Sequence, residues 1–402
     1  MRISSEKDKR YAWAEIDLAN LDHNIRLIRS TGSAGDTRIM AVVKGDGYGH
    51  GAVEVSKQVL ESGAAALGVA LVEEGIKLRK AGIGAPIYVL GECSPYSVAA
   101  AVKNKLILTI NSLSSAEVFS GIAEKNGGKL SVNINIDTGM NRVGINWKDA
   151  AGELPVIRKI RGINIEGVFS HFSCAGEEDD DFSKLQLERF SRVRKDIEKN
   201  LPDTGHIHHF ANSAAFFRFP FSRLDMARIG LSIYGLNPYG EGWEEWIPEE
   251  TRKMISGLKP VLSLKSRVSF IKRTGKGEPI SYCGTFKTKR ESVIATIPVG
   301  YADGYSRLLS NKASVLIGGM EAPVVGNITM DQFMIDITGI VKVKNVECGD
   351  EVVLIGRSGD KEIPVEDIAK LAGTINYEVV CMISERIPRV YPDKQSNKLE
   401  YR

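Results

Sequence analysis

Ile39-Met-Ala-Val-Val-Lys-Gly-Asp-Gly-Tyr-Gly-His-Gly51 is the most informative segment of this 402-residue chain. Its five leading apolar residues form the pattern of a buried parallel strand. Lys44 stands where that strand ends, and the glycines at alternate positions after it let the backbone turn tightly and approach a bound group. A lysine at the end of an apolar strand is partly desolvated and is a candidate Schiff-base amine. A solvated surface lysine is the alternative. Tyr48 and His50 in the same turn favour the chemical interpretation.

This segment begins a regular alternation of strand and helix patterns. The sequence predicts strands at 39–44, 65–70, 86–91, 106–110, 130–137, 163–170, 207–212 and 227–234. It predicts helices near 51–62, 71–81, 95–104, 113–126, 149–160, 182–199 and 213–218. Strands that alternate with helices in this way predict an α/β fold, and this number of units predicts a (β/α)8 TIM-type barrel. A doubly wound open sheet ranks lower, because no Gly-x-Gly-x-x-Gly follows a strand.

The pattern changes after Leu236. Residues 237–248 are turn-rich and acidic, as in a linker. Short β-like runs then follow at 261–271, 293–299, 313–317, 324–328, 333–337 and 352–355, and a helix is expected at 366–371. The sequence therefore predicts two domains: a barrel at 1–242 and a mostly antiparallel β domain at 243–402. The strand expected at 11–18 is a candidate to pair with the second domain.

Composition excludes several classes of function. Lys and Arg number 53 against 50 Asp and Glu, a net charge of +3, which argues against nucleic-acid binding and against a polybasic membrane anchor. No apolar run reaches the roughly 18 residues of a membrane span, and the polar N-terminus lacks a signal-peptide pattern. The 5 cysteines are scattered without a Cys-x-x-Cys, as expected of free thiols in a reducing cytoplasm. We therefore expect a cytoplasmic protein.

Polar side chains follow the predicted barrel strands at their carboxyl ends, where barrels of this type carry their chemistry. They are Lys44, the segment 137–142, His171, Asn212 with Ser213, and Arg228 with Gly230. Paired carboxylates are missing, which argues against a glycosidase. The set suits a phosphorylated, aldehyde-bearing cofactor, because the loops after the last two strands are the usual phosphate site and a helix start attracts anions. A metal site at His206, His208 and His209 is not expected, because strand alternation puts His206 and His208 on one face and His209 on the other, and no carboxylate accompanies them.

Short motifs along most of the chain resemble those of the alanine racemase family. They are the Lys44 segment, Asp137-Thr-Gly-Met-Asn-Arg142, His209-Phe-Ala-Asn-Ser213, Ser281-Tyr282, Gly300-Tyr-Ala-Asp-Gly304 and Met330-Asp331, in the family's order. The resemblance implies a pyridoxal 5'-phosphate enzyme that interconverts L-alanine and D-alanine and supplies D-alanine for peptidoglycan.

The resemblance also assigns the cofactor contacts. Lys44 would form the internal aldimine, and Arg228, supported by His209, would face the pyridine nitrogen. The other implied contacts are His171 at the ring, Arg142 at the phenolic oxygen, and Tyr48, Tyr377, Asn212, Ser213, Gly230 and Leu231 around the phosphate. Arginine keeps its proton, so the ring nitrogen would stay unprotonated and the ring would be a weaker electron sink.

Racemisation needs a proton removed on one face of the substrate and delivered on the other, which two bases achieve. The resemblance implies that Lys44 serves one face of an external aldimine and Tyr282 the other. The family places this tyrosine in the partner subunit's active site, which implies a head-to-tail homodimer. The residues implied at the substrate are Arg142, Tyr301, Met330 and Asp331.

Several positions depart from the family pattern. Asn135 stands where many members have a carbamylated lysine that supports the arginine equivalent to Arg142, so that support must come from elsewhere, a bound anion being one option. Further departures are Asn141, Phe286, Asn327 and Thr329, several of them near the implied substrate mouth. Three alternatives stay open: a serine or broad-specificity racemase, a non-catalytic pyridoxal-phosphate barrel, and a related decarboxylase. Tyr282 and the second domain argue against the carrier, and Arg228 argues against the decarboxylase.

Overall fold

The computed structural model describes residues 10–31, 37–200 and 207–392. Contacts divide the chain into two compact units. The barrel unit comprises residues 21–47 and 52–259, and the C-terminal unit comprises residues 1–20, 48–51 and 260–402. The short segment Tyr48–Gly51 therefore belongs by its contacts to the C-terminal unit, although barrel residues flank it in the sequence.

The barrel unit is a closed ring of parallel strands. In sequence order they are β2 (Arg38–Val42), β3 (Ala66–Val69), β4 (Ile87–Val89), β5 (Ile107–Ile110), β6 (Leu130–Asp137), β8 (Ile163–Phe169), β9 (Ile207–His209) and β10 (Met226–Ile229). The hydrogen-bonded order is β5-β4-β3-β2-β10-β9-β8-β6, and β5 pairs with β6 to close the ring. The predicted (β/α)8 barrel is thus confirmed. A short β7 (Ile145–Asn146) extends the sheet beside β6.

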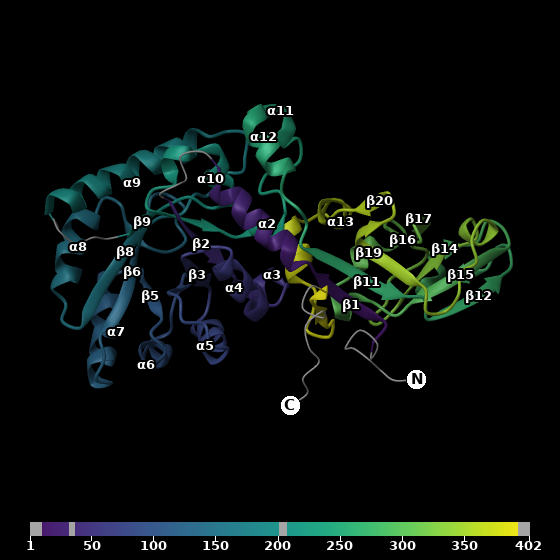
Figure 1. The fold of residues 1–402 in the computed structure, drawn as a ribbon, viewed down its shortest axis with the longest axis horizontal. Coiled ribbons are helices and arrows are strands. Elements are labelled where there is room, and N and C mark those ends of the chain that lie inside the picture. Colours follow the sequence, from purple (N-terminus) through teal and green to yellow (C-terminus); the bar gives the residue numbers. More distant parts are fainter. Residues whose placement is uncertain (1–9, 32–36, 201–206, 393–402) are drawn as a thin grey trace. The chain divides into compact units, whose positions relative to one another are not determined.

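The helices lie outside the barrel strands (Figure 1). They are α4 (Ala52–Glu61), α5 (Val72–Lys80), α6 (Pro95–Lys103), α7 (Leu113–Lys125), α8 (Ala150–Lys159), α9 (Asp181–Asn200) and α10 (Ser213–Arg218). Each corresponds to a helix predicted from the sequence. Local signals explain their starts: the Ser112 hydroxyl accepts a hydrogen bond from Ser115 N at 3.1 Å and so caps α7. Side chains including Met40, Tyr88 and Met226 fill the barrel interior.

The C-terminal unit is mostly antiparallel, as predicted. Its main sheet runs β17-β16-β19-β11-β1-β21, with β20 beside β19, and two smaller sheets are β12-β15-β18 and β13-β14. The bounds are β1 (Ala12–Ile16), β11 (Leu262–Arg267), β12 (Phe270–Thr274), β13 (Pro279–Ile280), β14 (Phe286–Lys287), β15 (Ser292–Ile297), β16 (Ser314–Ile317), β17 (Met320–Pro323), β18 (Phe333–Asp336), β19 (Glu351–Ser358), β20 (Lys361–Ile363) and β21 (Arg389–Val390). β1 pairs antiparallel with β11, with Trp13 opposite Lys265.

Five further helices belong to the fold. They are α2 (Leu18–Arg29), α11 (Trp243–Trp246), α12 (Glu249–Ser256) and α13 (Val365–Ala372), followed by α14 (Asn376–Cys381). Leu21, Ile25 and Ile28 are fully buried on α2, as its apolar spacing predicts. Across the described ranges, none of the helices combines the length and apolar character that a membrane crossing requires.

Four predicted strands are wrong in extent. The run expected at 261–271 forms two strands, β11 and β12, with Val268 and Ser269 between them. The apolar run 324–328 forms no strand beyond an isolated bridge of Val324 to Ile335, because Gly326 takes a positive φ of 81° and interrupts it. The strand expected at 227–234 ends at Ile229, and a 3-10 helix, η3 (Leu231–Tyr234), follows Gly230. The strand expected at 207–212 ends at His209. The last two breaks turn the chain where the polar residues of the predicted site lie.

Candidate functional site

Lys44 follows β2 and is exposed at the start of a left-handed turn. Gly45, Asp46 and Gly47 have φ values of 62°, 52° and 67°. Such conformations cost an ordinary residue roughly 1–2 kcal/mol each, which explains the alternate glycines. Asp46 is stabilised there because its carboxylate accepts hydrogen bonds from Ala52 N at 3.2 Å and from a lysine of α5 at 2.8 Å. The turn thus presents the Lys44 amine on a backbone of defined shape.

Glu74 holds this turn, a role that the sequence analysis missed. Its carboxylate accepts hydrogen bonds from Gly45 N and Ala70 N, both at 2.7 Å, and from Leu71 N at 3.1 Å. An acidic residue at the third position of a helix is an ordinary capping signal. Here the same carboxylate also fixes the residue after Lys44, so it ties two strand ends of the barrel together.

Arg228 lies at the end of β10 and is buried. Its Nη1 lies 2.7 Å from His209 Nδ1, and its Nη2 lies 3.0 Å from His171 Nδ1 and donates to Ser170 O at 2.7 Å. Burial, and then the charge of Arg142, lower the pKa of Arg228 to about 9. The guanidinium therefore stays protonated at neutral pH and is held rigidly at the carboxyl end of the barrel.

The tautomer of His209 follows from this contact. Arginine can only donate, so His209 Nδ1 accepts and Nε2 carries the proton. Asn133 Nδ2 lies 2.9 Å from Nε2, and two donors cannot bond. The amide must therefore be turned by 180°. That orientation also gives Asn133 Oδ1 a hydrogen bond that it otherwise lacks among the described residues. Asn133, His209 and Arg228 thus form one buried chain, in which Asn133 was not predicted.

His171 and His209 should make the protein less stable in acid. Burial first, and then the charge of Arg228, lower the pKa of both imidazoles well below the usual 6.5. The unfolded chain therefore binds more protons, and the free energy of unfolding decreases as the pH falls below about 6.5, by up to about 1.4 kcal/mol per pH unit for each group. Urea unfolding between pH 5 and 8 measures this slope. His209→Gln should reduce it, whereas Tyr282→Phe should keep it; a slope that His209→Gln leaves unchanged would contradict the assignment.

The ends of β9 and β10 are joined around Ser213. Its hydroxyl accepts hydrogen bonds from Gly230 N at 3.1 Å and Ser232 N at 3.5 Å, and Asn212 caps α10 by accepting from Ala215 N at 3.0 Å. Ser213, Gly230 and Leu231 are all buried. The hydroxyl of Ser232 is buried too and has no hydrogen-bond partner in the described part of the chain. The chain around Ser213 and Gly230 can therefore offer the Ser232 hydroxyl to a bound anion.

Arg142 is exposed on the loop after β6. Asp137 shapes that loop by accepting hydrogen bonds from Gly139 N at 2.8 Å and Asn141 N at 3.1 Å. Asn135, one of the departures from the family pattern, donates to Asn111 Oδ1 at 2.9 Å and to Val143 O at 3.2 Å. The uncharged side-chain amides of Asn111 and Asn135 thus hold the backbone of Val143, the residue next to Arg142. The charges of Arg228, Arg142 and Lys44 all act on His171, so the barrel unit brings these predicted residues together.

The predicted phosphate tyrosines, Tyr48 and Tyr377, lie together in the C-terminal unit. Their ring centroids are 6.2 Å apart. Burial is the main cause that raises the pKa of both phenols, that of Tyr377 to about 12. Gly49 makes this packing possible, because a Cβ there would overlap the carbonyl oxygen of Val380 in α14. Arg389 fixes the same segment by donating to Gly49 O at 2.9 Å.

Tyr282 is 73% exposed, in a strained turn between Ser281 and Cys283, which both have a φ of 64°. Asn327 donates to Tyr282 O at 2.9 Å and accepts through its own carbonyl from the Ser281 hydroxyl at 2.6 Å. Tyr301 and Met330 are also exposed, on two loops that backbone hydrogen bonds join. The C-terminal unit therefore carries Tyr282, the predicted second base, and the predicted substrate-binding residues Tyr301 and Met330 on loops that hydrogen bonds join.

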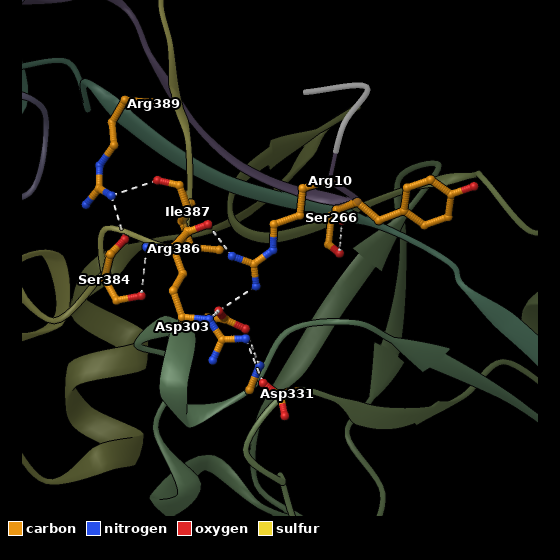
Figure 2. Close-up of polar contacts among 10 residues, drawn as sticks. Arg10, Ser266, Asp303, Asp331, Ser384, Arg386, Ile387 and Arg389 are labelled. Carbon is orange, nitrogen blue, oxygen red and sulfur yellow. Dashed lines mark hydrogen bonds and ion pairs between the residues drawn. The ribbon is translucent and has the colours of Figure 1, made fainter. Parts of the chain in front are cut away.

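Figure 2 shows an ion network around Asp303 that the sequence analysis did not predict. Asp303 is buried, and its carboxylate contacts Arg10 at 2.5 Å and Arg386 at 3.4 Å and accepts from Gly300 N at 3.0 Å. Arg386 also contacts Asp331 at 2.7 Å. The network therefore joins the loop that carries Tyr301 to the residue after Met330.

Asp303→Asn should destabilise the protein by about 2–3 kcal/mol, because it breaks a buried ion pair whose arginines keep partial access to water. Glu362→Gln is a matched control in the same unit: that carboxylate pairs with Arg357 at 2.7 Å, with the arginine 78% exposed. It should cost under about 1 kcal/mol. Thermal and urea unfolding of both variants measure the difference. Equal losses would mean that Asp303 is not a structural anchor.

The chain is similar to proteins of known family over nearly its whole length. Residues 16–238 match the family model "Alanine racemase, N-terminal domain", and residues 261–391 match "Alanine racemase, C-terminal domain". It is 43% identical over 383 residues to "Alanine racemase 1" of Clostridium acetobutylicum, with 95% of each chain covered. It is 42% identical over 387 residues to "Alanine racemase" of Halothermothrix orenii, covering 96% of this chain and 98% of that one. The solved alanine racemase of Bacillus anthracis with bound L-Ala-P matches with a TM-score of 0.86 and 38% identity over 95% of each chain.

Proposed function

Because the chain belongs to the alanine racemase family, and so to the isomerases, we propose that it interconverts L-alanine and D-alanine with pyridoxal 5'-phosphate as cofactor. The observation that carries this proposal is the convergence of Lys44, Arg142, His171 and Arg228 at the carboxyl end of the barrel. A relative with bound L-Ala-P supports an alanine-sized substrate. The D-alanine formed would serve peptidoglycan synthesis.

The residues present fit that cofactor. The Lys44 amine is exposed and can reach an aldehyde, and the buried Ser232 hydroxyl near Ser213 and Gly230 suits a phosphate. Tyr48 and Tyr377 would complete the phosphate contacts. Arg228 would face the ring nitrogen, where a protonated guanidinium can donate but cannot supply a proton readily. When bound, pyridoxal phosphate acidifies the Cα–H bond of the amino acid attached to it.

Lys44 and Tyr282 would move the proton. Lys44, as a neutral amine, would take the Cα proton on one face of the substrate, and the Tyr282 hydroxyl would deliver one on the other. Tyr282 lies in the C-terminal unit and is largely exposed. That exposure suits a residue that serves the active site of a second copy, so we propose a homodimer with shared sites. Arg142, Tyr301, Met330 and Asp331 would bind and orient the substrate.

Chiral product analysis tests the function directly. The purified protein is given pyridoxal phosphate and, in separate reactions, L-alanine, L-serine or L-lysine. We expect D-alanine to form well ahead of the other D-amino acids. Faster D-serine or D-lysine would keep the reaction class and change the substrate. Bound cofactor without any D-product would overturn the proposal in favour of a carrier or a decarboxylase.

A further inference from the structure

The C-terminal unit contains a cavity whose lining includes none of the residues proposed to hold cofactor and substrate. Its volume is about 230 Å³. Apolar side chains form most of its lining, among them Leu264 of β11, Ile355 of β19, Ile368 of α13, Val379 of α14 and Ile383 just after α14. An engineered apolar cavity of roughly 150 Å³ is enough to hold benzene, so this one can take a single substituted ring. Leu308 and Met382, also in the lining, are exposed, which places part of the wall at the surface.

Tyr305 is the polar feature of this cavity that the fold leaves unexplained. The residue is 2% exposed, lines the cavity and stacks on Phe333 with ring centroids 5.1 Å apart. Its hydroxyl is buried without a hydrogen-bond partner anywhere in residues 10–31, 37–200 and 207–392. Burial raises the pKa of this phenol, so it stays protonated and can donate a hydrogen bond. Buried polar groups normally have partners, so an unpaired hydroxyl on a residue that lines a cavity points to a ligand.

The charge at the rim restricts the ligand further. Glu378 lines the cavity and is exposed, and the Thr374 hydroxyl donates to its carboxylate. No lysine or arginine is among the lining residues. A carboxylate without a neighbouring cation disfavours an anion, and the apolar lining disfavours a strongly hydrated molecule.

We propose that this cavity binds a small, uncharged, mainly apolar molecule of about one substituted ring, with one oxygen hydrogen-bonded to the Tyr305 hydroxyl. The walls connect the cavity to the proposed active site. α14 carries Tyr377 immediately before Glu378, and Gly304 in the lining belongs to the loop of Tyr301. An occupant should therefore change the affinity for pyridoxal phosphate, and the cofactor should change the occupant's affinity by the same factor. This coupling, unlike the binding itself, rests on the proposed function.

The binding is tested with 4-fluorophenol and fluorobenzene, two probes that differ by one hydroxyl. Fluorine NMR on the full-length purified protein measures the affinity for each. Tyr305→Phe removes the protein hydroxyl and keeps the ring. We expect it to weaken 4-fluorophenol about tenfold and to leave fluorobenzene unchanged or slightly tighter. Tyr96→Phe, at a side chain that is 98% exposed, is the matched control and should change neither affinity.

A filling variant locates the site. Ala372 lies in the cavity wall at the end of α13, so Ala372→Phe should abolish binding of both probes; Ala372→Leu replaces it if the larger side chain prevents folding. Binding that survives a folded filling variant, or that Tyr305→Phe weakens equally for both probes, would overturn the proposal.

Titration with pyridoxal phosphate tests the coupling separately. Probe binding without any change in cofactor affinity would refute only the coupling, and a protein that binds no cofactor would refute the proposed function but not the cavity.

Discussion

Lys44→Ala is expected to reduce racemase activity by roughly 10⁴-fold or more, the largest effect of any single substitution in this chain. The proposed role of Lys44 is double, because its amine both attaches the cofactor and moves a substrate proton. General acid–base catalysis alone contributes roughly 10²–10⁴-fold, and loss of the attachment adds to this. The left-handed turn and the Glu74 carboxylate hold the backbone at this residue, so a substitution of the side chain should leave the fold intact.

Two measurements separate these roles. Chiral analysis of the products gives the rate, and the visible absorption of the protein with pyridoxal phosphate reports whether the cofactor is bonded to a lysine. Lys77→Ala is the matched control, because Lys77 contacts Asp46 of the same turn at 2.8 Å and is exposed. It should remain close to wild type in both measurements. If Lys44→Ala keeps the spectrum of the unaltered protein, another lysine anchors the cofactor.

The barrel could be predicted from the sequence because its signals are local. β3, β4, β5 and β10 are buried along their whole length, and they are apolar except for Thr109 in β5 and Arg228 in β10. The polar residues that follow such runs then meet at one end of the barrel as a consequence of the topology. Lys44, His171 and Arg228 were found in this way, before any contact between them was known.

The contacts that support those residues could not be predicted, because they join positions far apart in the sequence. Glu74 reaches Gly45 across 29 positions, Asn133 reaches His209 across 76, and Arg10 reaches Asp303 across 293. A pattern within a short stretch of sequence cannot predict contacts between positions so far apart. The run 324–328 shows the opposite error: its apolar residues are buried as a strand's would be, but Gly326 turns the backbone between them.

The segment Tyr48–Gly51 shows a further limit. It follows directly from the Lys44 turn, yet it packs with residues of the C-terminal unit. The Tyr391 hydroxyl donates to His50 O at 3.1 Å, and Arg389 donates to Gly49 O. The proposed cofactor lysine and a proposed phosphate tyrosine are therefore four positions apart in the sequence but belong to different compact units. The glycines that appeared to serve a ligand also serve this packing.

Tyr282→Phe is expected to slow racemisation by roughly 10²–10⁴-fold while cofactor binding and stability stay close to wild type. The reason is that Tyr282 is 73% exposed and, in the described residues, only its backbone takes part in the turn's hydrogen bonds. Removal of the hydroxyl therefore takes away a proton donor and leaves the fold alone. Cys283→Ser, the neighbouring residue in the same strained turn, is the matched control and should retain activity.

Isotope exchange makes this test specific for a two-base mechanism. In deuterated water, Tyr282→Phe with Lys44 intact should still exchange the Cα proton of one alanine enantiomer, without inverting it. The other enantiomer should exchange far more slowly, because its proton lies on the face that Tyr282 serves. A one-base mechanism would instead slow exchange and inversion equally for both enantiomers.

Mixed dimers test whether Tyr282 acts on a second copy of the chain. A dimer of one Lys44→Ala chain and one Tyr282→Phe chain should regain one intact active site only if Tyr282 acts on the partner subunit. No recovery of activity would place both bases in one chain.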